Sequence, residues 1–375
     1  MTVVLGSPVA APAPPRTGRR SGFAVVGLIV SLAAGGALLF GGAQPKKATP
    51  GGRLSAAQAW PKAQRADLPG SLADGPLFTP VLFLDAKTAV GTAPSPDAKS
   101  LRLIFRGGDG SLRELERLPA EDNPVFDSFT VAGDRVFWTQ STEKVRLQIW
   151  AADVRSGGVA RRLTADTGNA VFYGNQYDLV VAEGRVFWTA APGDAEVTEI
   201  RSVPLAGGPV GIRTEPGEWS LSAWPWLRED AANQTGTTRL RNMSTGREAE
   251  VRFSPGELTT CSPVWCVVMV MNDTGLVRID LMRPDGSGRR RIAGGGAQAA
   301  VTDVAILDRF EILSEAGPTS DLTGAAGLVV YDISTGRTVQ IAAAADGAYT
   351  RDGVLWWSTG APDDTVWHSL DLRTA

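Results

Sequence analysis

The apolar and polar positions beyond residue 58 follow a pattern of short strands and tight turns. A Gly or Asp turn is followed by alternating β-branched, aromatic and polar residues at 133–139 (GDRVFWT), 184–189 (GRVFWT) and 352–356 (DGVLW). This pattern predicts a strand that leaves a hairpin. A second phrase, two strands joined by a Gly turn, recurs between the first, as at 149–164 (IWAADVRSGGVARRLT) and 329–341 (VVYDISTGRTVQI).

Together the two phrases form a four-strand unit of about 40–50 residues, which is the period of β-propeller blades. We expect an all-β, seven-bladed propeller, with six blades as the alternative count. The expected units are 78–120, 121–168, 169–216, 217–256, 257–296, 297–343 and 344–375. The last unit ends after its third strand. A strand within 59–69 (AWPKAQRADLP) is therefore expected to complete it and to close the ring, which removes the free sheet edges.

The longest apolar run, residues 23–40, contains 18 residues and no charge. At about 1.5 Å per residue it is just long enough to cross a bilayer. Arg16, Arg19 and Arg20 precede it, which favours an N-terminus inside the cell. Cleavage as a signal peptide is the alternative. We expect a disordered cytoplasmic tail (1–21), a transmembrane signal anchor (22–43), a linker (44–58) and an extracytoplasmic propeller (59–375) at the cell membrane.

The charge and the rare reactive residues narrow the functional classes. Residues 55–375 carry 31 Lys or Arg against 40 Asp or Glu, a net charge of −9 that disfavours nucleic acid as a partner. The chain has one histidine, His368, and two cysteines, which removes most metal sites and most histidine-based catalysis. His368 stands alone beside Trp367, and we expect it to be structural. No cofactor, metal ligand or catalytic residue is predicted.

The two cysteines, Cys261 and Cys266, lie in the segment TTCSPVWCVVM, at the expected first hairpin of the fifth unit. With Ser262–Trp265 as the turn, they face each other across two strands at a separation that suits a disulfide. An exported domain meets an oxidising compartment, so we expect the disulfide, which would pin a loop that bears an exposed Trp265. A redox-active pair is disfavoured because the spacing is not C-x-x-C.

Three tryptophans crowd the start of the fourth unit: Trp219, Trp224 and Trp226, in EWSLSAWPWLRED. If the segment is extended, Trp224 and Trp226 share a face. Together with Trp265 they form a candidate aromatic platform for a sugar or peptide ligand. The alternative interpretation is that they cover the junctions between blades.

Two repeat phrases resemble those of known propellers. The segment 149–164 resembles the third and fourth strands of TolB-like blades, and RVFWT resembles the second strand of TolB-like and YWTD-type blades. The TolB turn signature, Ser-Pro-Asp-Gly-Lys, is present in degraded form at 95–99 (SPDAK). The resemblance covers about 78–375 and implies a propeller with a binding role in a bacterial cell envelope.

From these observations we expect a membrane-tethered, non-catalytic binding or scaffolding protein, not an enzyme. Its partners would be the membrane, through the N-terminal helix, and an envelope protein or glycan; we expect a monomer. The alternative is an extracytoplasmic polysaccharide lyase or hydrolase with an acidic site in the central channel. A cluster of Asp and Glu side chains with shifted pKa values, facing the channel, would favour the enzyme.

Overall fold

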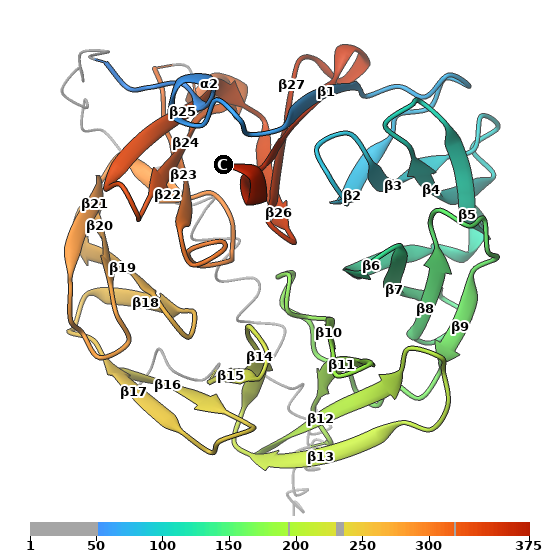
Figure 1. Ribbon diagram of the computed structural model, residues 1–375, viewed down its shortest axis with the longest axis horizontal. Coiled ribbons are helices and arrows are strands. Elements are labelled where there is room, and N and C mark those ends of the chain that lie inside the picture. Colours follow the sequence, from blue (N-terminus) through green and yellow to red (C-terminus); the bar gives the residue numbers. More distant parts are fainter. Residues whose placement is uncertain (1–51, 194–195, 230–235, 319) are drawn as a thin grey trace, which may run out of the picture. The chain divides into compact units, whose positions relative to one another are not determined.

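The computed structural model describes residues 52–193, 196–229, 236–318 and 320–375. Within these ranges, seven antiparallel four-stranded sheets are arranged as blades around a common axis (Figure 1). This arrangement confirms the seven-bladed propeller, and the unit boundaries expected from the repeat agree closely with the blades. The expected tail and signal anchor (1–43) lie outside the described residues. Among the helices that are described, none is long and apolar enough to cross a membrane.

Each blade runs from an inner strand near the axis to an outer strand at the rim (Figure 1). From the axis outward, blade 1 consists of β2 (Thr79–Phe83), β3 (Ala89–Pro94), β4 (Ser100–Arg106) and β5 (Leu112–Pro119), and blade 2 of β6 (Val125–Ala132), β7 (Arg135–Ser141), β8 (Gln148–Asp153) and β9 (Arg161–Thr164). Blade 3 consists of β10 (Val180–Ala182), β11 (Arg185–Ala190), β12 (Val197–Pro204) and β13 (Gly211–Pro216), and blade 4 of β14 (Trp219–Leu221), β15 (Trp226–Glu229), β16 (Thr237–Asn242) and β17 (Glu248–Arg252). Blade 5 consists of β18 (Glu257–Cys261), β19 (Cys266–Asn272), β20 (Gly275–Met282) and β21 (Arg290–Gly294), and blade 6 of β22 (Ala297–Ala299), β23 (Phe310–Glu315), β24 (Ala326–Asp332) and β25 (Arg337–Ala345). Blade 7 consists of β26 (Gly347–Arg351), β27 (Val354–Thr359), β28 (Val366–Asp371) and, as its outer strand, β1 (Arg65–Pro69). Short helices are α2 (Ala56–Ala59), α3 (Ser320–Thr323), η1 (Ala120–Asp122), η3 (Pro362–Asp364) and η4 (Leu372–Thr374).

The hydrophobic core lies between neighbouring blades. The repeated RVFWT phrase forms the second strand of blades 2 and 3, where Trp138 and Trp188 are fully buried. Trp188 packs in the cluster between these two blades, and its indole N–H donates to the carbonyl of Thr167 at 2.9 Å. A sheet that is covered on both faces needs apolar residues on both, so the strict alternation of apolar and polar residues breaks down in these strands.

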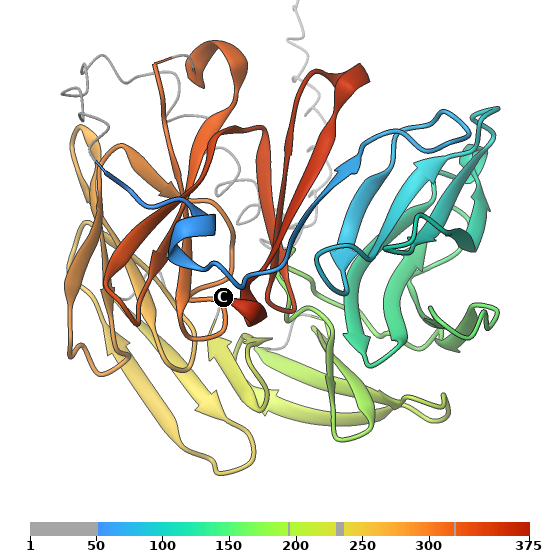
Figure 2. The same cartoon turned by 45° about the horizontal axis from the view of Figure 1, so that its top comes forward.

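The ring closes by pairing β1 with β28. The register runs antiparallel from Arg65 opposite Leu370 to Pro69 opposite Val366, so the N-terminal strand supplies the outer strand of blade 7. Figure 2 shows the blue strand lying beside the red blade. The expected closure by a strand within 59–69 is therefore confirmed.

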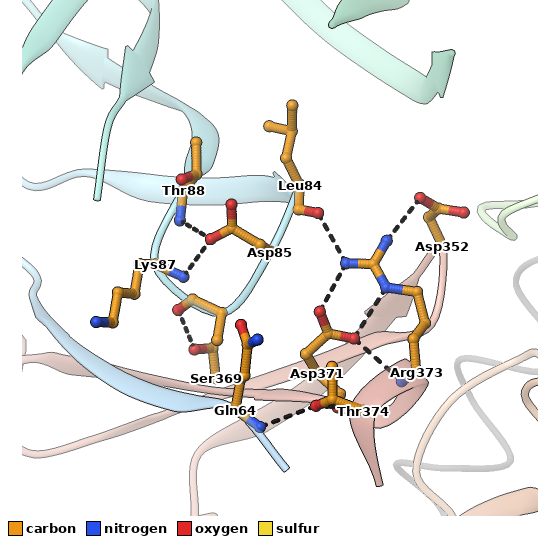
Figure 3. A network of polar contacts seen from close by, with 11 residues as sticks. Gln64, Leu84, Asp85, Lys87, Thr88, Asp352, Ser369, Asp371, Arg373 and Thr374 are labelled. Atoms are coloured by element: carbon orange, nitrogen blue, oxygen red, sulfur yellow. Dashed lines mark hydrogen bonds and ion pairs between the residues drawn. The ribbon is translucent and has the colours of Figure 1, made fainter. Parts of the chain in front are cut away.

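Polar contacts join the closed blade 7 to blade 1. The guanidinium of Arg373 donates to Asp371, to Asp352 and, at 2.7 Å, to the carbonyl of Leu84 at the end of β2 (Figure 3). On the other side of the seam, the backbone N–H of Gln64 donates to the Thr374 hydroxyl at 2.8 Å. These bonds hold the two ends of the ring together around the seam.

The segment before β1 is also fixed to the propeller. Ser55 and Gln58 form a capping box that starts α2, within the range expected to be a linker. Trp60 follows the helix and is buried, with its ring edge-on to Phe310 at 5.3 Å and its indole N–H 3.3 Å from Asp332. The burial of Trp60 explains why this segment adopts a defined structure. Its Pro- and Ala-rich sequence does not predict that burial.

Cys261 and Cys266 form the expected disulfide. They end β18 and begin β19, directly opposite each other, with their Cα atoms 4.0 Å apart. The bridge clamps the turn Ser262–Trp265, whose closing hydrogen bond runs from the Ser262 N–H to the Trp265 carbonyl at 2.7 Å.

Replacing Trp60 with Ala should lower the free energy of unfolding by about 3–5 kcal/mol, because the change leaves a cavity against Phe310 beside the seam. Urea unfolding at one pH would measure the loss. Val159→Ala, at a side chain that is 90% exposed, is the matched control and should change little. Equal stability of the two variants would show that the Trp60 anchor is dispensable for ring closure.

Candidate functional site

A turn inserted beside the inner strand of blade 3 reaches the axis. Residues 173–179 precede β10, and the carboxylate of Asp178 organises them by accepting backbone N–H bonds from Tyr173 at 2.9 Å, Gly174 at 2.7 Å and Asn175 at 3.2 Å. Three donors on one carboxylate make a compact turn. Asp178 is itself buried, so its charge sits inside the protein.

A second inserted turn comes from blade 6, between β22 and β23. Residues 301–309 carry Asp303, which is buried, and three non-glycine residues with positive φ: Ala305, Leu307 and Asp308. The N–H of Ala305 donates to Glu311 at 2.8 Å, and Glu311 is almost completely buried behind the turn. Left-handed backbone is uncommon for residues with a side chain, so this turn holds an unusual local conformation.

The two turns lie close to each other although they come from different blades. Gln176, from blade 3, lies close enough to Asp303 of blade 6 to lower the pKa of that carboxyl, although blades 4 and 5 lie between them along the ring. Arg351, the last residue of β26 in blade 7, donates through Nη1 to the carbonyl of Phe129 in blade 2. Blades 2, 3, 6 and 7 therefore converge at one place.

We call Asp178, Asp303 and Arg351 the axis cluster. Burial raises the pKa of Asp178 to about 6, and backbone N–H donors and the Arg351 charge offset only part of that rise. Burial likewise raises the pKa of Asp303 to about 6 against the opposing effects of Arg351 and Gln176. Burial lowers the pKa of Arg351, whereas Asp303 and Asp178 favour its charged form. The charge of one guanidinium thus acts on two carboxyls whose pKa values are raised by burial.

Two neighbours extend the cluster. Burial raises the pKa of Glu311 to about 8, and the charge of Asp303 adds to that rise, so Glu311 keeps its proton at neutral pH. Burial also raises the pKa of Tyr177, with Asp303 and Asp308 acting in the same direction. Carboxyls whose pKa values are pushed apart provide an acid and a base at the same pH, which is the arrangement that general acid–base catalysis requires.

Some polar atoms of this region have no protein partner. The Nε of Arg351 and the hydroxyl of Ser128 are buried and make no hydrogen bond to the part of the chain that the structure describes. Ser128 adjoins Phe129, whose carbonyl accepts from Arg351. Buried groups without a partner are costly and suit a ligand or an ordered water.

Two surface hollows lie away from this centre. One, of about 350 Å³, is lined by residues that include Arg53, Arg291 and Glu315, at the junction of blades 5 and 6. The other, of about 310 Å³, lies beside Pro94 and Val125 between blades 1 and 2. Neither includes a residue of the axis cluster. Since neither brings shifted carboxyls together, we place the candidate chemistry at the axis.

The four tryptophans expected to form a ligand platform are not brought together. Trp265 is buried, with its indole N–H 3.0 Å from the Asp308 carbonyl and the Arg283 guanidinium 3.6 Å above its ring, so the expectation of an exposed Trp265 is wrong. Trp219 is also buried. The cause for Trp265 is the neighbouring blade 6, which covers the disulfide-clamped turn.

Trp224 and Trp226 lie on opposite sides of blade 4. Trp224 packs on Phe187 of blade 3, with ring centroids 4.0 Å apart, whereas Trp226 packs with the cluster that contains Leu240 and Cys261. The segment is a turn here rather than an extended strand, since the Trp226 N–H donates to the carbonyl of Ala223 at 2.9 Å. That turn explains why the two rings do not share a face.

Sequence reasoning did not identify the axis cluster. The signal available was the length of the segments before β10 and before β23, which exceed what an inner strand needs. The first contains Gly and Asn, residues that are usual in exposed turns. The burial of the two turns depends on closure of the whole ring. No local sequence pattern predicts that closure.

The comparisons with known proteins agree with the fold. No protein-family model and no curated protein matches the sequence. Among solved structures, the propeller domain of the trilobed protease from Pyrococcus furiosus is 10% identical with a TM-score of 0.42, covering 64% of this chain and 79% of that one. A prolyl endopeptidase is 12% identical with a TM-score of 0.48, covering 83% and 50%. An oligogalacturonate lyase in complex with manganese is 12% identical with a TM-score of 0.45, covering 82% and 83%.

At these identities the likeness concerns the propeller fold alone, and the TolB-like or YWTD-like resemblance stays a prediction. The expectation that the protein is not an enzyme is corrected. The structures that share its architecture include proteases, prolyl endopeptidases and a lyase. At the axis, burial raises the pKa values of Asp178 and Asp303.

Glu311→Gln should make the stability of the protein less dependent on pH. The folded pKa is about 8 and the ordinary value is 4.5, so Glu311 stabilises the fold below about pH 4.5, and that contribution is lost as the pH rises to about 8. Between pH 5 and 8 the loss amounts to as much as about 4 kcal/mol.

Urea unfolding at both pH values would measure this effect, since the glutamine keeps an acceptor for Ala305 but does not ionise. Glu121→Gln, at an exposed position, is the control and should retain the wild-type pH dependence. A Glu311→Gln variant that loses as much stability as the wild type between pH 5 and 8 would contradict the buried, protonated state.

Proposed function

We propose that the protein is an extracytoplasmic propeller enzyme that cleaves a polysaccharide by acid–base catalysis at the axis cluster. One observation carries the proposal: Asp178 and Asp303 are buried near the charge of Arg351, and burial raises the pKa of each carboxyl to about 6. A purely structural ion pair would hold both carboxyls fully ionised at neutral pH. Here burial keeps each of them able to gain and lose a proton in that range.

The proposed roles follow from the protonation states. When one carboxyl of the pair is protonated, it donates its proton to the glycosidic oxygen of the leaving group. The ionised partner either takes a proton from water, which then attacks the sugar carbon, or takes a proton from the sugar ring, which leads to elimination. The first route is a hydrolase reaction and the second is a lyase reaction.

Arg351 supports this chemistry by stabilising whichever carboxyl is ionised. Its Nε and the Ser128 hydroxyl are buried without a hydrogen-bond partner in the part of the chain that the structure describes. Glu311, deeper in blade 6, remains protonated at neutral pH and so does not add a negative charge beside Asp303. Removal of that charge keeps the pKa of Asp303 from rising further.

Asp178→Asn and Asp303→Asn should each reduce cleavage by at least about 100-fold, because each removes one proton-transfer group. The measurement is product release from a panel of neutral and uronic-acid polysaccharides, with reducing ends scored for both routes and unsaturated ends for the lyase route. Asp321→Asn, an exposed site, is the control. Thermal melts establish that each variant is folded, and full activity in a folded Asp303→Asn variant would refute the proposal.

We further propose that the apolar run 23–40 tethers the propeller outside the cell membrane. The run and the disulfide support this placement, since disulfides persist in oxidising compartments. Alkaline phosphatase fused after Ala375 should be active in cells, and a reporter that requires the cytoplasm should be silent there. The reverse pattern would overturn the proposed location.

A further inference from the structure

The single histidine belongs to a chain of three polar side chains on blade 7. Asp67 Oδ1 lies 2.7 Å from His368 Nδ1, and His368 Nε2 lies 2.8 Å from the Thr359 hydroxyl. The three residues come from β1, β28 and β27, which are neighbours in the sheet. His368 therefore has two polar partners, although its isolation in the sequence had suggested that it has none.

The hydrogen-bond polarity follows from the chemistry of the groups. An ionised carboxylate only accepts, so Nδ1 carries the proton that is donated to Asp67. In the neutral imidazole, Nε2 then has a free lone pair and accepts from the Thr359 hydroxyl. This hydroxyl, imidazole and carboxylate sequence is the arrangement that activates a nucleophile by general-base catalysis.

The imidazole is held in place on its other sides. His368 lies directly opposite Asp67 on one neighbouring strand and opposite Trp357 on the other. The Trp357 ring stacks on the imidazole, with centroids 5.4 Å apart and an interplanar angle of 22°. Thr359 is the last residue of β27, and Gly360 follows it in an exposed turn.

The arrangement is open to solvent. The side chain of His368 is 22% exposed and that of Asp67 is 74% exposed, and Thr359 is partly exposed. A reagent can therefore reach the hydroxyl from the rim of the propeller. This separates the three residues from the buried axis cluster, which uses none of them.

We propose that Thr359, His368 and Asp67 form a second reactive site that transfers an acyl group from a small ester. The Thr359 oxygen attacks the ester carbonyl as its proton passes to His368 Nε2. The ester C–O bond then breaks, and the leaving alcohol takes that proton. Water, activated by His368 in the same way, cleaves the resulting Thr359 ester and releases the acid.

The site exists only in the closed ring, because Asp67 reaches His368 through the pairing of β1 with β28. It does not depend on the proposed polysaccharide activity, since the two sets of residues are distinct. A failure at Thr359 therefore leaves the axis proposal intact, and the converse also holds.

The test is acylation of the full-length protein by p-nitrophenyl acetate, with the modified residue identified by peptide mass spectrometry. We expect an acetyl group on Thr359. Thr359→Ser should retain the adduct, and Thr359→Val, which keeps the side-chain shape, should lose it. Thr335→Val, at an exposed turn hydroxyl, is the control and should be labelled at Thr359 like the wild type.

Asp67→Asn provides the decisive variant. The asparagine amide donates to His368 Nδ1, which moves the imidazole proton to Nε2 and removes the acceptor for the Thr359 hydroxyl. We expect acylation of Thr359 to slow at least tenfold with an unchanged melting temperature. No adduct on wild-type Thr359, or equal acylation rates in the wild type and Asp67→Asn, would overturn the proposal.

Discussion

The antiparallel pairing of β1 with β28 is the constraint on which the other features of this propeller depend. Each blade is a separate four-stranded sheet, and the last blade is complete only when a strand from the start of the domain pairs with β28. The pairing gives blade 7 its outer strand, at the opposite edge of the sheet from β26 and Arg351. It also brings Asp67 beside His368 at the rim.

The centre of the ring combines close packing with unusual electrostatics. Turns from blades 3 and 6 meet there through Gln176 and Asp303, and the acids they carry lie away from water. Burying a carboxylate is costly unless it is paired and hydrogen-bonded. Asp178 receives three backbone N–H bonds, and the charge of Arg351 favours the ionised forms of Asp178 and Asp303, which offsets part of that cost. The remaining cost appears as raised pKa values.

The sequence predicted the blades well because a blade is made of local hairpins, and a hairpin leaves a local pattern of alternation and turn residues. The disulfide was predictable for the same reason, since Cys261 and Cys266 flank one turn. Contacts between residues far apart in the sequence left no such trace. Asp67 and His368 are 301 positions apart, and the burial of Asp303 and Trp265 results from neighbouring blades rather than from adjacent residues. The sites therefore emerged only with the assembled ring.

The seam has a consequence for biosynthesis. Among the strands that the structure describes, the one that completes blade 7 precedes all the others in the sequence, whereas its partner β28 follows them. During most of elongation, β1 has an unpaired edge while blades 1 to 6 form from contacts within each newly made segment. Contacts between residues so distant in sequence form slowly, and exposed strand edges invite aggregation. A nascent chain of this protein therefore needs protection of its first strand until the last one emerges.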